Sequence, residues 1–186
     1  MKRALRFLGL AALCGLGLNA LAAGNVAKIG DTVYATIEEA HANVPDGGTI
    51  ELIANAVLTQ EIDNKTASGV SMHACKFTVD LKGYTLTMNS GIYTFYDITF
   101  KNGTIKISDP SGAEMGTPWT KVFYVEGNAK IAPVTLTFDH VKFVCEQATV
   151  TALIETSGTN AVNKPTVRFN ECELDLASCG KPVNLG

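Results

Sequence analysis

Several residue types and patterns that would indicate a particular chemistry are scarce in this sequence. Among its 186 residues there is one tryptophan, and the three histidines are far apart in the chain. No Cys-x-x-Cys pair occurs, so the spacing typical of a zinc site is missing. Charged residues make up only 18% of the chain and hydrophobic residues 46%, which excludes an intrinsically disordered protein. The sequence therefore predicts a folded domain with no metal site and no cofactor.

The first 22 residues have the pattern of a secretory signal peptide. Three basic residues open the chain: Lys2, Arg3 and Arg6. Residues 7–21 are almost continuously apolar, too short a run for a membrane span, and small residues around Ala22 suit a signal peptidase. Cleavage there would leave residues 23–186 as a single domain and change the net charge from −3 to −6. We expect a secreted, cell-surface or periplasmic protein with no nucleic-acid partner and no membrane span in the mature chain.

Four cysteines follow the signal peptide, and the sequence does not choose among the three disulfide pairings that four cysteines allow. Cys145 and Cys172 fall on inward positions of a repeat, where cysteine packs as a small apolar residue. Cys179 lies beyond the last strand-like segment and is the cysteine best placed to pair. Its candidate partner is Cys172.

A short helix is predicted near the start of the mature chain. Gly30-Asp31, between two apolar segments, is typical of a hairpin turn. Thr36 has the position of a helix N-cap, and Glu39 completes a capping box. Residues 45–48, Pro-Asp-Gly-Gly, end the pattern, so we expect a capping helix over residues 36–44. Strands are expected afterwards, because many of the twenty threonines alternate with apolar residues.

A ten-residue template recurs along the rest of the chain. It occupies residues 79–88, 98–107, 136–145 and 167–176. Each copy has two alternating apolar residues, a polar corner and a second alternating pair, and such a unit buries its apolar face only by stacking on the next copy. With a third strand-like run before the later copies, the pattern predicts a parallel β-helix of about five coils. In it, Leu81, Phe100, Phe138 and Phe169 would form one internal column. A β-sandwich would not repeat this template in parallel register.

Particular segments also resemble a known group of proteins. Residues 29–40 (Ile-Gly-Asp-Thr-Val-Tyr-Ala-Thr-Ile-Glu-Glu-Ala) and 45–52 (Pro-Asp-Gly-Gly-Thr-Ile-Glu-Leu) resemble the opening of right-handed parallel β-helix proteins of the pectate-lyase-like superfamily, in which a short helix caps the first coil. Residues 79–86 and 98–105 resemble successive coils of that fold. The resemblance implies an exported or cell-surface bacterial protein. It does not imply one activity, since this superfamily includes enzymes, adhesins and binding modules.

Charged residues form the first candidate site. Equivalent positions of adjacent coils lie about 4.8 Å apart, which would bring four side chains to one edge: Asp139, His140, Arg168 and Glu171. A lyase acting on acidic polysaccharide could use His140 or Lys142 as base, and Arg168, or a calcium ion held by Asp139 and Glu171, to neutralise the substrate carboxylate. A glycosidase would use Asp139 and Glu171. The alternative is a solvated ladder of charges, with Lys142 paired to Glu173.

Aromatic residues form the second candidate site. An insertion at residues 108–120 is rich in turn residues and carries Trp119, which could stack on a sugar ring. Tyr93 and Phe95 fall on the outward parity of their strand, and aromatic platforms on a rigid sheet bind glycans at little entropic cost. The alternative is that Trp119 folds back over a sheet and that Tyr93 and Phe95 turn inward.

The end of the repeat completes the prediction. Only ten residues follow Leu176, so residues 177–186, another chain or a downstream region absent from a truncated sequence would have to cover the last coil. We expect an all-β, exported module that binds polysaccharide or a cell-surface glycan without catalysis. The runner-up is a polysaccharide lyase or glycoside hydrolase, and a third hypothesis is a structural spacer or assembly unit that self-associates at its open end.

Overall fold

The computed structural model describes residues 24–64, 74–108, 121–127, 133–145, 152–158, 163–177 and 183–185. The predicted signal peptide, nearly all of the predicted insertion including Trp119, and Cys179 lie outside these described residues. The described part is mostly β-structure, which confirms the all-β prediction. No helix within it is long and apolar enough to cross a membrane.

The strands form two sheets. Seven strands follow one another in the larger sheet, in the order β13 (Thr166–Asn170), β11 (Thr135–Cys145), β9 (Ile98–Ile107), β6 (Phe77–Asp80), β3 (Gly48–Leu52), β1 (Ala27–Ile29) and β2 (Thr32–Tyr34). Three more strands attach to it: β4 (Ala56–Leu58), β7 (Thr85–Met88) and β14 (Glu173–Asp175). The five-stranded sheet has the order β15 (Val183–Leu185), β12 (Ala152–Gly158), β10 (Lys121–Gly127), β8 (Ile92–Thr94) and β5 (Ile62–Asn64).

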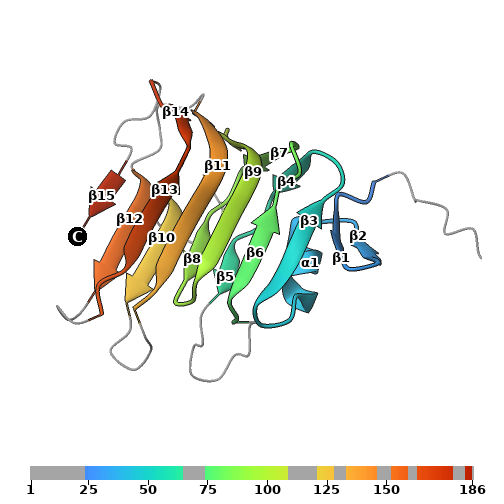
Figure 1. The fold of residues 1–186 in the computed structure, drawn as a ribbon, viewed down its shortest axis with the longest axis horizontal. Coiled ribbons are helices and arrows are strands. Elements are labelled where there is room, and N and C mark those ends of the chain that lie inside the picture. Colours follow the sequence, from blue (N-terminus) through green and yellow to red (C-terminus); the bar gives the residue numbers. More distant parts are fainter. Residues whose placement is uncertain are drawn as a thin grey trace, which may run out of the picture.

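Nearly all strand pairs are parallel, because the chain visits the two sheets in turn. It passes through β3, β4 and β5, then through β6, β7 and β8, and each new strand lies beside the strand of the previous pass. Only the pairs of β1 with β2 and with β3 are antiparallel among the described strands. Figure 1 shows the result, in which the sequence colours advance from one end of the stack to the other.

The N-terminal elements follow the sequence prediction. The β1–β2 hairpin turns at Gly30-Asp31, with Gly30 at a φ of 57°. The helix α1 (Ile37–Asn43) begins after its N-cap Thr36, whose Oγ1 accepts a hydrogen bond from the Glu39 backbone N–H at 3.0 Å. The Glu39 carboxylate accepts one in return from the Ala35 backbone N–H. The predicted helix over residues 36–44 is therefore confirmed.

The predicted internal column needs one correction. The register of β6 and β9 pairs Val79, and not Leu81, with Phe100, and Phe138 and Phe169 follow as predicted. The first copy of the template has a corner longer by two residues, because four residues separate Asp80 from Thr85 where two separate Lys101 from Thr104. Leu81 is buried in that corner, where a Cβ added to Gly103 would lie 2.5 Å from the Leu81 Cβ.

The corners share an uncommon backbone conformation. Asn102, His140 and Glu171 occupy the same place in successive passes, and their φ angles are 59°, 55° and 49°. In the longer first corner, Lys82 and Gly83 are both left-handed. A left-handed residue changes the direction of the chain locally. β9 and β11 continue through this corner, whereas in the last pass the corner at Glu171 separates β13 from β14.

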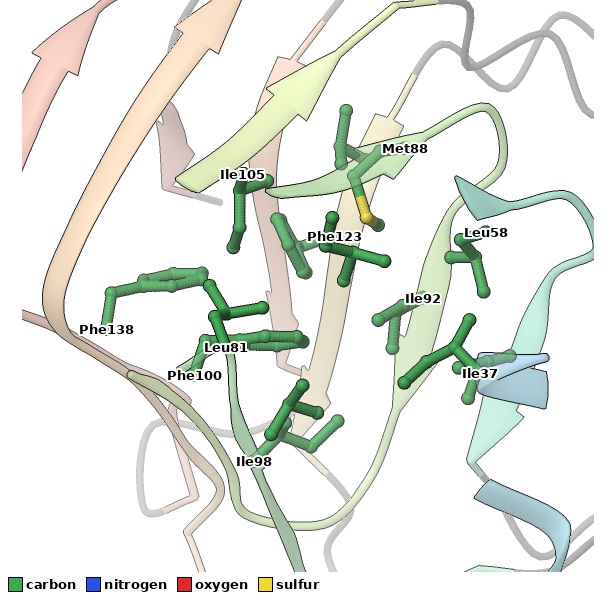
Figure 2. Close-up of a cluster of buried hydrophobic side chains, with 14 of the residues drawn as sticks. Ile37, Leu58, Leu81, Met88, Ile92, Ile98, Phe100, Ile105, Phe123 and Phe138 are labelled. Atoms are coloured by element: carbon green, nitrogen blue, oxygen red, sulfur yellow. The ribbon is translucent and has the colours of Figure 1, made fainter. Parts of the chain in front are cut away.

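Aromatic rings fill the space between the two sheets. Phe138 stacks on Phe100 with ring centroids 5.6 Å apart and on Phe169 at 5.4 Å. Phe123 comes from the five-stranded sheet and meets Phe100 and Phe138 edge to face. Figure 2 shows the rings of Phe100, Phe123 and Phe138 together with Leu81 and Ile105. Packing of this kind fixes the two sheets against each other, so both outer faces have a rigid base.

The cysteines agree with the predictions only in part. Cys172 is unpaired and packs against the core, as its inward position in the repeat predicts. Cys172 is a free thiol, 3.5 Å from the Phe138 carbonyl oxygen and 3.4 Å from that of Asn170, so the predicted pairing of Cys172 with Cys179 is wrong. Cys145, expected to be an unpaired apolar residue, is buried as predicted but disulfide-bonded. Cys75 is free and buried, and burial, with a smaller effect of Asp46, raises its pKa to about 11.

Candidate functional site

Two tyrosines lie in register on the outer face of the five-stranded sheet. Parallel pairing aligns Asp63 in β5 with Tyr93 in β8, Tyr124 in β10 and Glu155 in β12. We call these four residues the tyrosine column. The residues on either side of each member are buried, so the column itself points away from the core. Adjacent members are therefore about 4.8 Å apart along the stack.

The aromatic rings of this face are packed against one another. The Tyr93 and Tyr124 ring centroids are 4.8 Å apart with the ring planes at 75°, and Phe95 meets Tyr93 at 5.4 Å. The Tyr93 hydroxyl donates a hydrogen bond to Glu126 Oε2. Burial, followed by the contact with Glu126, raises the pKa of Tyr93 well above its usual value, so the phenol stays protonated.

Charged side chains border the rings. Lys121 Nζ lies 4.7 Å from the centre of the Tyr124 ring and forms an ion pair with Glu155. Asp63 and Glu126 add two further carboxylates. Among the described residues this face thus combines half-buried aromatic rings with three carboxylates and one ammonium group. Such a surface offers apolar ring faces together with hydrogen-bond acceptors.

The sequence prediction located part of this site. Tyr93 lies in the column and Phe95 packs against it, whereas Trp119 lies outside the described residues. Tyr124, Glu126 and their neighbours were not predicted. Alternation within the strand-like run at residues 122–126 could have placed Tyr124 and Glu126 on one face. The alignment of this run with β8 could not be predicted, because the insertion at residues 108–120 lies between the two strands in the sequence.

The predicted charged cluster is partly assembled at the corner of the larger sheet. His140 Nδ1 lies 3.1 Å from Asp139 Oδ1, and His140 Nε2 lies 2.9 Å from Glu171 Oε2. Arg168 is exposed on β13 opposite Thr137, and no described ion pair joins it to these three. Lys142 Nζ contacts Glu173 Oε1 at 2.6 Å, as the stacking of the template predicts.

This corner geometry suits an ion-pair ladder better than a general base. Both ring nitrogens of His140 face carboxylate oxygens, and both contacts are hydrogen bonds only when each nitrogen carries a hydrogen. A general base needs a nitrogen lone pair directed at the substrate. The side chains of His140 and Glu171 are also largely exposed, where ion pairs contribute little to stability.

A more buried carboxylate lies in the same ladder. The Asp80 side chain is 6% exposed, accepts hydrogen bonds from the Lys82 backbone and the Asn102 amide, and has ammonium groups of Lys82 and Lys101 within 3.6 Å. Burial alone would raise the pKa of Asp80. The hydrogen bonds and the two lysines outweigh it and bring the pKa below its usual value.

We expect Asp80→Asn to lower the free energy of unfolding by about 1 kcal/mol at neutral pH. A lowered pKa means that the Asp80 carboxylate stabilises the fold above the usual pKa of aspartate, and that this stabilisation is lost as the pH falls through the lowered value. Urea unfolding at neutral and acid pH measures both effects. Asp139→Asn is the matched control, since this more exposed carboxylate contacts only His140 among the described side chains. An Asp80→Asn protein with the same acid sensitivity as the original would contradict the assignment.

No group of three or more His, Cys, Asp or Glu side chains in the described ranges could hold a metal ion. No family model, curated protein or solved structure matches the chain.

Proposed function

We propose that the chain is an exported, cell-surface or secreted right-handed parallel β-helix, similar to the pectate-lyase-like superfamily, that binds carbohydrate without catalysis. The alternation between two parallel sheets and the left-handed corners at equivalent positions support the β-helix. A rigid stack presents the same outward position again and again along one line. A chain-like ligand such as a polysaccharide matches a surface of that form.

The observation that carries the proposal is the tyrosine column. Sugar rings bind through C–H groups that lie on aromatic faces, and their hydroxyl groups donate hydrogen bonds to carboxylates. Tyr93 and Tyr124 supply the aromatic surface, while Asp63, Glu126 and Glu155 supply acceptors. The column is held by strands whose other side is the packed core, so binding costs little ordering of the protein.

The charge of the face that carries the tyrosine column favours one class of glycan. Three carboxylates and one ammonium group give this face an excess of negative charge among the described residues. Acidic polysaccharides would be repelled, whereas neutral sugars and amino sugars would not. The ligand class proposed is therefore a neutral or amino-sugar-containing glycan.

We expect Tyr124→Ala to weaken glycan binding roughly tenfold, because it removes about 1.4 kcal/mol of ring contact. A glycan array identifies ligands of the unaltered protein, and calorimetric titration with the best of them measures the variant. Tyr84→Ala is the matched control, since Tyr84 is 38% exposed and lies in the corner before β7, outside the column. Equal weakening by both variants, or no ligand on the array, would contradict the proposal.

An activity assay on the unaltered protein distinguishes the binding proposal from the enzymatic alternative. Incubation with polygalacturonate and alginate, with and without calcium, is followed by the absorbance of unsaturated product. We expect no product, because His140 has both nitrogens directed at carboxylates. Product that disappears in His140→Ala would replace the binding proposal by a lyase.

A further inference from the structure

One end of the stack has strand edges without a described partner. β13 and β14 both pair with β11 on one side, and together with the corner between them they form the last pass through the larger sheet. We call residues 166–175 the terminal rung. At the opposite end, α1 and the β1–β2 hairpin lie against the first strands (Figure 1). The two ends of the molecule are therefore not equivalent.

The terminal rung exposes the side chains that earlier passes bury. Phe138 and Phe143 in β11 are completely buried, but their counterparts Phe169 and Leu174 are 37% and 51% exposed. Phe169 stacks on Phe138 on one side only among the described rings. Any partner that covers the terminal rung therefore has to supply apolar side chains at the spacing of Phe169 and Leu174.

Charge is divided between the two arms of the terminal rung. The first arm is β13, which carries Arg168, and Lys164 lies shortly before β13 begins. The second arm is β14, which carries Glu173 and Asp175. A basic arm and an acidic arm that meet at a corner are complementary to each other after rotation by half a turn.

We propose that the protein forms a two-fold symmetric dimer in which the terminal rungs of two copies pair in antiparallel fashion. A two-fold axis that bisects the corner exchanges the two arms, so the basic arm of each copy lies along the acidic arm of the other. With the axis between Asn170 and Glu171, inward residues meet inward residues. Val167 then faces Leu174 of the second copy, and Arg168 faces Glu173 of the second copy.

This arrangement satisfies the requirements that the exposed end imposes. Opposed strands supply hydrogen bonds to the edge backbone groups of β13 and β14. Phe169 and Leu174 become covered, which continues the internal column across the interface. Glu173 already contacts Lys142 within its own chain, and Arg168 of the second copy extends that pair into a short ladder of alternating charge.

The test is a charge exchange followed by sedimentation equilibrium. The unaltered protein should be a dimer at micromolar concentration, and Arg168→Glu should weaken dimerisation at least tenfold by placing like charges together. The double variant Arg168→Glu with Glu173→Arg restores opposite charges across the axis and should recover the dimer. Leu174→Ser, at an exposed position that tolerates a polar residue in the monomer, should weaken dimerisation without lowering the melting temperature of the monomer.

One control variant tests whether the effect is specific to the terminal rung, and two results would overturn the dimer proposal. Lys106→Glu also replaces a positive charge by a negative one, but in β9, away from the terminal rung and aligned with Thr87. This control variant should leave the dimer intact. A monomeric unaltered protein at high micromolar concentration would overturn the proposal, since something other than a second copy would then cover the end. Failure of the double variant to recover the dimer would overturn the proposed pairing of the arms.

Discussion

Phe138→Ala is expected to lower the free energy of unfolding by about 3–5 kcal/mol, the usual cost of removing a buried phenylalanine. The Phe138 ring is completely buried and contacts four other rings, from Phe100, Phe123, Phe143 and Phe169. Its removal leaves a cavity between the two sheets that strands hydrogen-bonded on both sides of β11 cannot close. Urea unfolding followed by circular dichroism measures the loss.

Phe169→Ala is the matched control for this prediction. Phe169 continues the same column but is 37% exposed and contacts two rings, Phe138 and Phe143, so its removal should cost only about 1–2 kcal/mol. The comparison is made at low protein concentration, where the proposed dimer does not cover Phe169. Equal losses in the two variants would show that the column does not stabilise the fold as the geometry indicates.

The sequence predicted the later passes of the stack better than the first. Residues 98–107, 136–145 and 167–176 align as the template requires. The first copy was misaligned because Val79 and Leu81 are both apolar and two residues apart, and a shift of two residues leaves every side chain on the same face of a strand. Alternation therefore fixes the face of a residue but not its register, which here depends on the length of the corner.

The two candidate sites differ in how far they could be predicted. The contacts of His140 with Asp139 and of Lys142 with Glu173 follow from positions within or between adjacent copies of the template. The tyrosine column joins strands separated by segments of unequal length, so the alignment of Tyr93 with Tyr124 required coordinates. The sequence predicts which side chains are adjacent only where the repeat is regular. The strands that carry Tyr93 and Tyr124 belong to the part where the repeat is irregular.

The inside of the stack also contains a polar contact that sequence patterns did not indicate. Asn64 is completely buried, and its amide donates hydrogen bonds to the Cys75 carbonyl at 2.9 Å and to Thr94 Oγ1 at 3.0 Å. Its Oδ1 accepts one from the Cys75 backbone N–H at 2.8 Å. One side chain thus satisfies both backbone groups of Cys75 and ties the end of β5 to β8.

Asn64→Ala is expected to lower the free energy of unfolding by about 2–5 kcal/mol, because a buried N–H and a buried carbonyl of Cys75 lose their partner and each costs about 1–3 kcal/mol. Asn55→Ala is the matched control. Asn55 is exposed and, among the described residues, accepts one hydrogen bond, from the Thr85 backbone N–H, so we expect a loss of about 1 kcal/mol or less. Urea unfolding of both variants measures the difference. Losses of similar size would mean that water replaces the Asn64 amide, and that the contact between the first two passes does not depend on it.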